Sequence, residues 1–359
     1  MRNILKNPLK VFFPKKIVGI DIGTSSIKVV EVSRWGEGKT LENYGEIKSD
    51  TIYKEPVNSG EKGDTLLSTG FVSTAIKAIM EEAKIKTKAV IFSIPDFSTF
   101  CTSFEIPAMS EKEVPEAIKY SAAQHITLPI SEVALDWRIV SSDPTSKTAP
   151  LKIFLVAIPN QVVKEYQDIA KNTGLELYAL EAEAWGLARA FIKSSKKTIC
   201  VMDIGVQSST INIIDDGFLK RSYSFNFYSS QLAKAVSSAL SLEYDEASEI
   251  TNREGILSTR EGVAQTLYLL VDPLLAKIRG ISSEFLQSEQ KEVEEVYLTG
   301  GTANLPGLKE YFQEMLKKKV TVPNCFSDLL YPPILEETLK EMSPSFSVAT
   351  GVALGGLEK

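Results

Sequence analysis

The chain has 359 residues, of which 43% are apolar and 24% are charged, and its formal net charge is −6 at pH 7. This composition is typical of a globular protein with a large core, so it excludes a wholly disordered chain, and the acidic balance argues against a general nucleic-acid binder. Because one hydrophobic core usually stops growing at about 250–300 residues, we expect two lobes or several subdomains.

Residues 1–16 form a basic segment with five Lys or Arg residues and no acid, interleaved with apolar side chains. Two interpretations remain open, a disordered lead-in to the first strand or a segment that contacts an anionic membrane surface. The segment lacks a continuous apolar region and a small-residue cleavage site, so we do not expect a signal peptide. No apolar run in the chain approaches the roughly 20 residues that a membrane helix needs.

Residues 17–96 are predicted to form the core of a first lobe. From Ile17 to Val32 the sequence IVGIDIG, TSS, IKVVEV predicts a strand, a polar turn and a second strand, which together make a hairpin. A short strand is expected over about 41–47, an amphipathic helix over 68–84 and an apolar strand over 89–94.

Residues 97–180 predict a compact inserted module with the order β-α-β-β-α-β. We expect its strands over 99–106, 133–140, 152–157 and 176–180, and its helices over 110–124 and 160–173. Ser110 and Glu113 have the spacing of a capping box at the start of the first of these helices. A connecting helix within 181–197 then returns the chain to the first lobe.

The second half of the chain begins with a copy of the first hairpin. Residues 198–215, TICVMDIGVQSSTINIID, again predict a strand, a turn and a strand, and this duplication is the main clue to the organisation. We expect the core of a second lobe over 198–242 and 290–343, with a helical subdomain over 243–289. A last helix over about 345–354, within a segment 344–359 that returns to the first lobe, would end at Gly355 and Gly356 as its cap.

The two Asp-Ile-Gly motifs carry the predicted chemistry. Asp21 and Asp203 each end an apolar strand, so each carboxylate would lie at the mouth of a hairpin with a glycine and hydroxyl residues at its tip. Glycine lets backbone amides approach a phosphate closely, and two such hairpins facing each other would grip a triphosphate from both sides. The two carboxylates would hold a hydrated Mg²⁺, which binds few carboxylates and keeps several waters. One copy alone is equally compatible with a simple β-turn, whereas two copies favour the phosphate site.

The third motif is LTGGTANLPGL, from Leu298 to Leu308. A strand runs into a double glycine and then a helix, so the backbone at Gly300 and Gly301 is bare enough for a base or ribose to lie against it. The start of the following helix favours an anionic ligand.

Other candidate sites are weaker. Gly38-Lys39-Thr40 resembles the end of a Walker A loop, but Ser33 stands where that motif needs its first glycine. His125 is the single histidine, and without partners it is better explained as a surface or cap residue than as a catalyst. The three cysteines have no metal-binding spacing and are expected to be reduced thiols.

With two phosphate hairpins and a base turn in this order, the chain resembles the actin-like ATPase superfamily, an α/β fold of two lobes that each contain a mixed sheet and flanking helices. The segments IVGIDIGTSSIKVVEVSR and IPAMSEKEVPEAIKYSAAQHITLPISEVALDW, with the inserted module, are similar to the type IV pilus assembly protein PilM. The resemblance extends over roughly 16–357. The cell-division protein FtsA shares the inserted module.

The resemblance implies a set of ATP and Mg²⁺ contacts. Asp21 and Asp203 would be the metal residues, and Glu183 would position a water, unless it is a solvent-facing helix acid beside Glu181. The cofactor-binding positions would be Gly23, Thr24, Ser25, Ser26 and Lys28 in the first hairpin, Gly205, Gln207, Ser208 and Ser209 in the second, and Gly300, Gly301 and Thr302 in the base turn.

Three positions depart from the family pattern. Val206 replaces a smaller residue, and Ser248 and Thr251 stand where relatives tend to carry Glu and Lys facing the nucleoside. Each lost charge-assisted bond would cost about 1.5–3 kcal/mol of binding. We therefore expect nucleotide binding with weak or absent ATPase activity.

The function that the resemblance implies is an ATP-binding cytoplasmic scaffold, peripheral at the inner face of the cell membrane. It would bind the N-terminal cytoplasmic peptide of a PilN-like membrane protein in a groove between the first lobe and the inserted module, and would contact the membrane through that partner. Other pilus platform or motor proteins are further candidate partners. The alternatives are an FtsA-like membrane-tethered filament protein, a type II secretion platform homologue, and a small-molecule kinase, for which no general base is visible.

Overall fold

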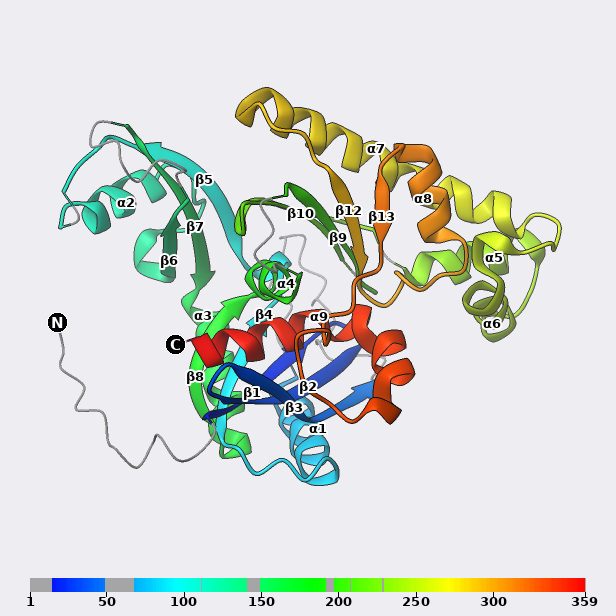
Figure 1. Cartoon of the computed structure of the whole chain (residues 1–359), viewed down its shortest axis with the longest axis horizontal. Helices are drawn as coiled ribbons and strands as arrows, with labels where there is room; N and C mark the ends of the chain where they lie inside the picture. The colour runs from blue at the N-terminus through cyan, green and yellow to red at the C-terminus, as the bar shows by residue number, and fades with distance from the viewer. Residues whose placement is uncertain are drawn as a thin grey trace.

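Two five-stranded sheets form the centres of two lobes in the computed structural model, which describes residues 15–48, 68–110, 112–140, 149–191, 197–206, 208–227 and 229–358. The first sheet has the order β3-β2-β1-β4-β8 and the second the order β11-β10-β9-β12-β13 (Figure 1). The strands of the first sheet are β1 (Lys15–Ile22), β2 (Ser26–Trp35), β3 (Gly38–Lys48), β4 (Ala89–Ile94) and β8 (Glu176–Ala182). Those of the second are β9 (Ile199–Ile204), β10 (Ser209–Asp215), β11 (Phe218–Phe225), β12 (Glu295–Thr299) and β13 (Lys319–Thr321).

The two sheets have the same construction. In each, three antiparallel strands come first in the chain, and two later strands then add in parallel beside the first of them. The duplication predicted from the two hairpins is therefore present in the fold. The chain has the α/β architecture with two lobes that the sequence predicts.

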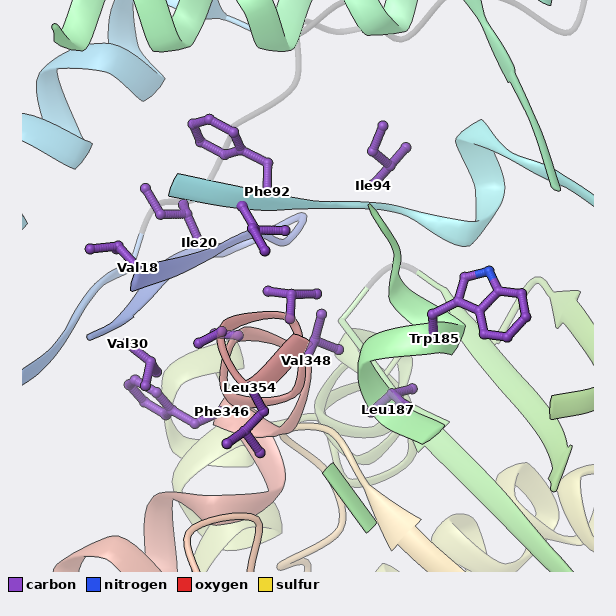
Figure 2. Close-up of a cluster of buried hydrophobic side chains, with 14 of the residues drawn as sticks. Val18, Ile20, Val30, Phe92, Ile94, Trp185, Leu187, Phe346, Val348 and Leu354 are labelled. Carbon is purple, nitrogen blue, oxygen red and sulfur yellow. The ribbon is translucent and has the colours of Figure 1, made fainter. Parts of the chain in front are cut away.

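Helix α9 (Glu336–Glu358) lies between the two sheets together with α4 (Glu183–Phe191), as Figure 1 shows. Side chains from β1, β2, β4, α4 and α9 meet in one buried cluster (Figure 2). On the other side of the first sheet lie α1 (Thr69–Glu82) and α3 (Asn160–Thr173), where Phe92 meets Tyr166 edge to face.

The predicted end of the last helix is wrong. Gly355 and Gly356 lie inside α9 and do not cap it. A Cβ at Gly356 would lie 2.7 Å from the Ile17 side chain, so this glycine lets the helix approach the first sheet closely. Pro344 also lies within α9, which begins well before the predicted start at residue 345.

The inserted module is smaller than the predicted β-α-β-β-α-β unit. Its own sheet contains β5 (Phe100–Ile106), β7 (Leu151–Pro159) and β6 (Val133–Ile139) in that order, and α2 (Val114–Ala122) shares its core. The last predicted strand of the module, β8, instead pairs in parallel with β4 in the first sheet, and α3 packs against α1. Sequence order alone does not show which sheet a strand joins.

The predicted capping box forms a turn ahead of the helix. Both the backbone N–H and the hydroxyl of Ser110 donate to Glu113 Oε2, at 3.0 and 2.7 Å. Helix α2 begins only at Val114, with Pro115 in its first turn. Proline has no backbone N–H, and the first turn of a helix is where that N–H has no helical partner, so Pro115 favours a start here.

The second lobe has helices both inside and outside the segment 243–289 that the sequence predicts as a helical subdomain. Its helices are α5 (Ser230–Leu240), α6 (Tyr244–Glu254), α7 (Val263–Glu289) and α8 (Leu308–Leu316), with a short 3₁₀ turn η4 (Gly255–Leu257). They share a separate hydrophobic core with β9, β10 and β12. Within the described ranges, no helix combines the length and apolar composition needed to cross a membrane.

The inserted module also contacts the second lobe. The buried Lys220 of β11 donates from Nζ to the carbonyl of Val140 at 2.7 Å, and Lys152 of β7 pairs with Glu289 at the end of α7 at 2.8 Å. Arg221 shares the same glutamate at 3.5 Å. These contacts join the inserted module to the second lobe.

Candidate functional site

The two hairpin loops close in the same way. The Gly23 N–H donates to the Ser26 carbonyl at 3.0 Å, and the Gly205 N–H donates to the Ser208 carbonyl at 3.0 Å. A Cβ at Gly23 would lie 3.2 Å from the Ser26 carbonyl oxygen, and a Cβ at Gly205 would lie 2.6 Å from the Ser208 carbonyl oxygen. A side chain would therefore be crowded at Gly23 and would clash at Gly205. Thr24, Ser25 and Ser208 are half-buried, Ser26 and Ser209 are buried, and Gln207 lies outside the described residues.

Asp21 is held at the end of β1. Its side chain is buried, and Oδ1 accepts a hydrogen bond from the Ser93 hydroxyl at 2.7 Å. Ser93 is fully buried on the neighbouring parallel strand β4. Burial raises the pKa of Asp21, while Lys28 and the Ser93 hydrogen bond lower it.

Asp203 occupies the matching position at the end of β9. Burial raises the pKa of Asp203 to about 7, and the charges of Asp21 and Asp96 add to this effect. The carboxylates of the two lobes therefore lie close enough to repel each other. In the part of the chain that the structure describes, no group of three or more His, Cys, Asp or Glu side chains has the geometry of a metal cage.

Lys28 is the cation nearest this acidic space. It lies opposite Asp21 in the hairpin register, and its charge lowers the pKa of both Asp21 and Asp203. Its Nζ donates to the Ser26 hydroxyl at 2.5 Å and pairs with Glu46 at 3.6 Å. The ammonium is thus already bonded within the first hairpin, at the loop where phosphate is expected.

The base turn packs directly on the second hairpin. Gly300 has φ +83°, and a Cβ there would collide with Asp203 Oδ1 and lie 2.5 Å from the Ile204 carbonyl. The Thr302 N–H donates to the same carbonyl at 3.4 Å, and the Gly300 N–H donates to Pro344 O of α9 at 3.0 Å. Gly301, in contrast, is exposed and faces open space.

Glu183 begins α4 and points to the same acidic space. It is half-buried, and its pKa is raised well above the usual value by burial and then by Asp21, Asp96 and Asp203. Its neighbour Glu181 is different, since it forms an ion pair with Arg189 at 2.7 Å. The interpretation of Glu183 as a solvent-facing helix acid does not fit this setting.

Two residues of the site were missed from the sequence, Ser93 and Asp96. Both lie at the carboxyl end of β4, where Asp96 is buried and its backbone N–H donates to Glu183 Oε2 at 3.4 Å. The signal was available, because side chains at the carboxyl ends of neighbouring parallel strands meet at one edge of a sheet. Using it requires knowing that β4 lies beside β1.

The positions that depart from the family pattern hold no charge. Thr251 is buried and its hydroxyl donates to the Ala247 carbonyl at 2.7 Å, while Ser248 accepts from Asn252 at 3.4 Å. The Val206 carbonyl accepts from the Ser230 hydroxyl at 3.4 Å. His125, the single histidine, stacks on Phe104 in the inserted module with ring centroids 5.0 Å apart.

The arrangement fits a nucleotide with Mg²⁺. A Cβ would clash in the Gly205 loop and be crowded in the Gly23 loop, and the charge of Asp21 raises the pKa of Asp203 from the other lobe. Mg²⁺ commonly uses one or two carboxylates, phosphate oxygens and waters rather than a cage of protein ligands, so the absence of such a cage among the described residues is compatible with it.

Comparison with solved structures identifies the fold. A structure of a PilM–PilN type IV pilus biogenesis complex matches with a TM-score of 0.81 and 21% identity, covering 96% of this chain and 99% of that chain. The ethanolamine utilisation protein EutJ from Carboxydothermus hydrogenoformans matches with a TM-score of 0.54, 17% identity and coverage of 96% and 90%. An MreB of Spiroplasma citri bound to AMPPNP matches with a TM-score of 0.50, 12% identity and coverage of 95% of each chain. The chain therefore has the actin-like ATPase fold.

Sequence comparison gives the family. The cell division protein FtsA of Staphylococcus epidermidis is 21% identical over 354 residues, covering 85% of this chain and 73% of that protein. FtsA of Enterococcus faecalis is 22% identical over 351 residues, covering 86% and 78%. The family model described as type IV pilus assembly protein PilM matches residues 19–357. With almost its whole length matched, the chain belongs to the PilM family of type IV pilus assembly proteins.

Proposed function

We propose that this chain is an ATP-binding scaffold of a type IV pilus assembly platform. The observation that carries the proposal is the pair of hairpins, closed by the same hydrogen bond, whose aspartates lie close enough for the charge of Asp21 to raise the pKa of Asp203. The Mg²⁺ bound with a triphosphate would offset this repulsion, so the charges of the two aspartates would favour binding of the cation.

Each part of the site has a distinct role in this proposal. The amides and hydroxyls of residues 23–26 and 205–209 bind phosphate oxygens, and Lys28 adds a positive charge to the first loop. Asp21 and Asp203 would hold Mg²⁺, and the cation would supply charge neutralisation at the phosphates. Gly300, Gly301 and Thr302 lie against the nucleoside.

The same geometry favours binding over turnover. Glu183 is placed to hold a water near the phosphates, but it lies among acids that raise its pKa. The uncharged Ser248 and Thr251 offer no charge-assisted bond to the nucleoside. We therefore propose weak or absent hydrolysis, with the nucleotide setting the angle between the lobes.

The partner proposed for this scaffold is the N-terminal cytoplasmic peptide of a PilN-like membrane protein. The similar complex of PilM with PilN supports this choice. Strand β8 ends the first sheet below the inserted module, so among the described strands its outer edge has no neighbour (Figure 1). An extended peptide adds readily to such an edge. The exposed rings of Tyr178 on β8 and Phe97 at the module joint would supply apolar contacts.

Binding a membrane-anchored peptide would place the chain at the cytoplasmic face of the inner membrane without inserting it. Other platform or motor proteins would join through the remaining surface. This proposed location depends on the proposed partner.

Calorimetric titration of the full chain tests both parts of the proposal. We expect heat on titration with Mg-ATP, lost in D203N, and heat on titration with a synthetic PilN N-terminal peptide, reduced in Y178A. Y120A is the matched control, because Tyr120 is exposed on the far helix α2. If neither Mg-ATP nor the peptide gives heat or raises the melting temperature, the scaffold proposal fails.

A further inference from the structure

Asp96 lies at the joint where the inserted module leaves the first lobe. It begins the short 3₁₀ turn η2 (Asp96–Ser98), between β4 of the first sheet and β5 of the module. The joint is fixed by its own backbone, since the Thr99 N–H and hydroxyl both donate to the Asp96 carbonyl, at 3.2 and 3.1 Å. A shift of β5 therefore moves Asp96.

The Asp96 side chain caps a helix to which it does not belong. Its Oδ1 accepts a hydrogen bond from the backbone N–H of Ala184, in the first turn of α4, at 3.4 Å. N–H groups in the first turn of a helix have no partner within the helix, and an aspartate carboxylate is a preferred acceptor for them. The adjacent Asp96 N–H donates to Glu183 Oε2 at 3.4 Å. The side chain and the backbone N–H of Asp96 thus both bond to the first turn of α4.

The second oxygen of Asp96 supports a role in the cleft. Asp96 is only 6% exposed, and its Oδ2 is buried without a hydrogen-bond partner among the described residues. The Asp96 charge raises the pKa of both Glu183 and Asp203, so its carboxyl group lies near both acids. A buried acceptor without a hydrogen-bond partner is unfavourable and rare in folded proteins, and it is often associated with a functional position.

We propose that Asp96 is a positioning residue that links the inserted module to the nucleotide cleft by holding Glu183 and the N-terminus of α4. Movement of the module, for instance when a peptide binds at its boundary, then shifts Glu183 relative to the phosphates. The link to nucleotide rests on the function proposed above, whereas the cap on α4 does not.

Hydrogen exchange tests the cap without any ligand. In D96A the amide of Ala184 is expected to exchange about fivefold faster, the effect of losing a cap of roughly 1 kcal/mol. In D96N, whose Oδ1 remains an acceptor, its protection is retained. D168A is the control, because Asp168 is an exposed aspartate on α3. If D96A does not fold, D96S serves instead, since its shorter side chain does not reach Ala184. Unchanged exchange at Ala184 in the folded variant would overturn the proposal.

A double-mutant cycle tests the action through Glu183. We expect D96A to change the dissociation constant of Mg-AMPPNP by about threefold or more in the otherwise native chain, and by less than about 1.5-fold when E183A is already present. D168A is expected to change it in neither background. Equal effects of D96A in both backgrounds would overturn the role of Asp96 as a positioning residue. If the native chain does not bind Mg-AMPPNP, the proposed nucleotide function fails, and the exchange result still decides whether Asp96 caps α4.

Discussion

Replacing Gly300 by alanine is a sharp test of the contact between the base turn and the second hairpin. Gly300 has φ +83°, and its Cα faces Asp203 and the Ile204 carbonyl with no room for a methyl group. Alanine in a left-handed conformation costs about 1–2 kcal/mol, and forcing a methyl group into a packed contact costs about 1–3 kcal/mol. We therefore expect G300A to lower the free energy of unfolding by about 2–5 kcal/mol.

The neighbouring glycine supplies the control. Gly301 is exposed, and a Cβ there meets nothing within 4 Å, so G301A is expected to change stability by less than about 0.5 kcal/mol. Urea denaturation followed by circular dichroism measures both variants. Calorimetry is expected to show weaker Mg-ATP binding in G300A, because the displaced turn pushes Asp203 out of position. Equal stability of G300A and G301A would refute the packing of this turn against Asp203.

Three further predictions use the same assays. S93A removes the donor to Asp21 and is expected to raise the dissociation constant of Mg-ATP roughly tenfold, with S93T close to the native value; a native affinity in S93A would contradict this. Because burial raises the pKa of Asp203 to about 7, the unfolding free energy without Mg²⁺ should fall as the pH rises from about 4 to 7. In urea titrations D203N should show a smaller fall. An unchanged fall in D203N would exclude Asp203 as its cause. G351A places a methyl group against the backbone of α4 and should lower the free energy of unfolding by about 1–3 kcal/mol. The control G280A, at an exposed position on α7, should raise it by about 0.5–1 kcal/mol. Thermal melts that show the same sign for both variants would contradict the close packing of α4 against α9.

Much of the fold was predictable from local patterns. The boundaries of β4 and α3 agree with the expected ranges, because each is a continuous apolar or periodic segment with clear breakers at its ends. Both hairpins and their aspartates were predicted, because the Asp-Ile-Gly motif occurs twice and each copy supports the interpretation of the other. The antiparallel pairing of β1 with β2 and of β9 with β10 followed from these hairpins.

The remaining errors concern neighbours in space. The sequence does not show that β8 pairs with β4 rather than with the module, because either sheet can take an apolar strand of that length. The start of α9 was missed because its first turns are polar and exposed, and because Pro344 resembles a boundary although the structure contains it within the helix. Ser93 and Asp96 were missed for the same reason as β8, since their role depends on which strand lies beside β1.

The central claim is that both hairpins bind one triphosphate and its cation between them. A crystal structure of the full chain grown with Mg-AMPPNP tests this most directly. We expect the terminal phosphates between residues 23–26 and 205–209, with Mg²⁺ linked through waters to Asp21 and Asp203. A nucleotide bound elsewhere, or two aspartates that do not approach the same cation, would contradict it.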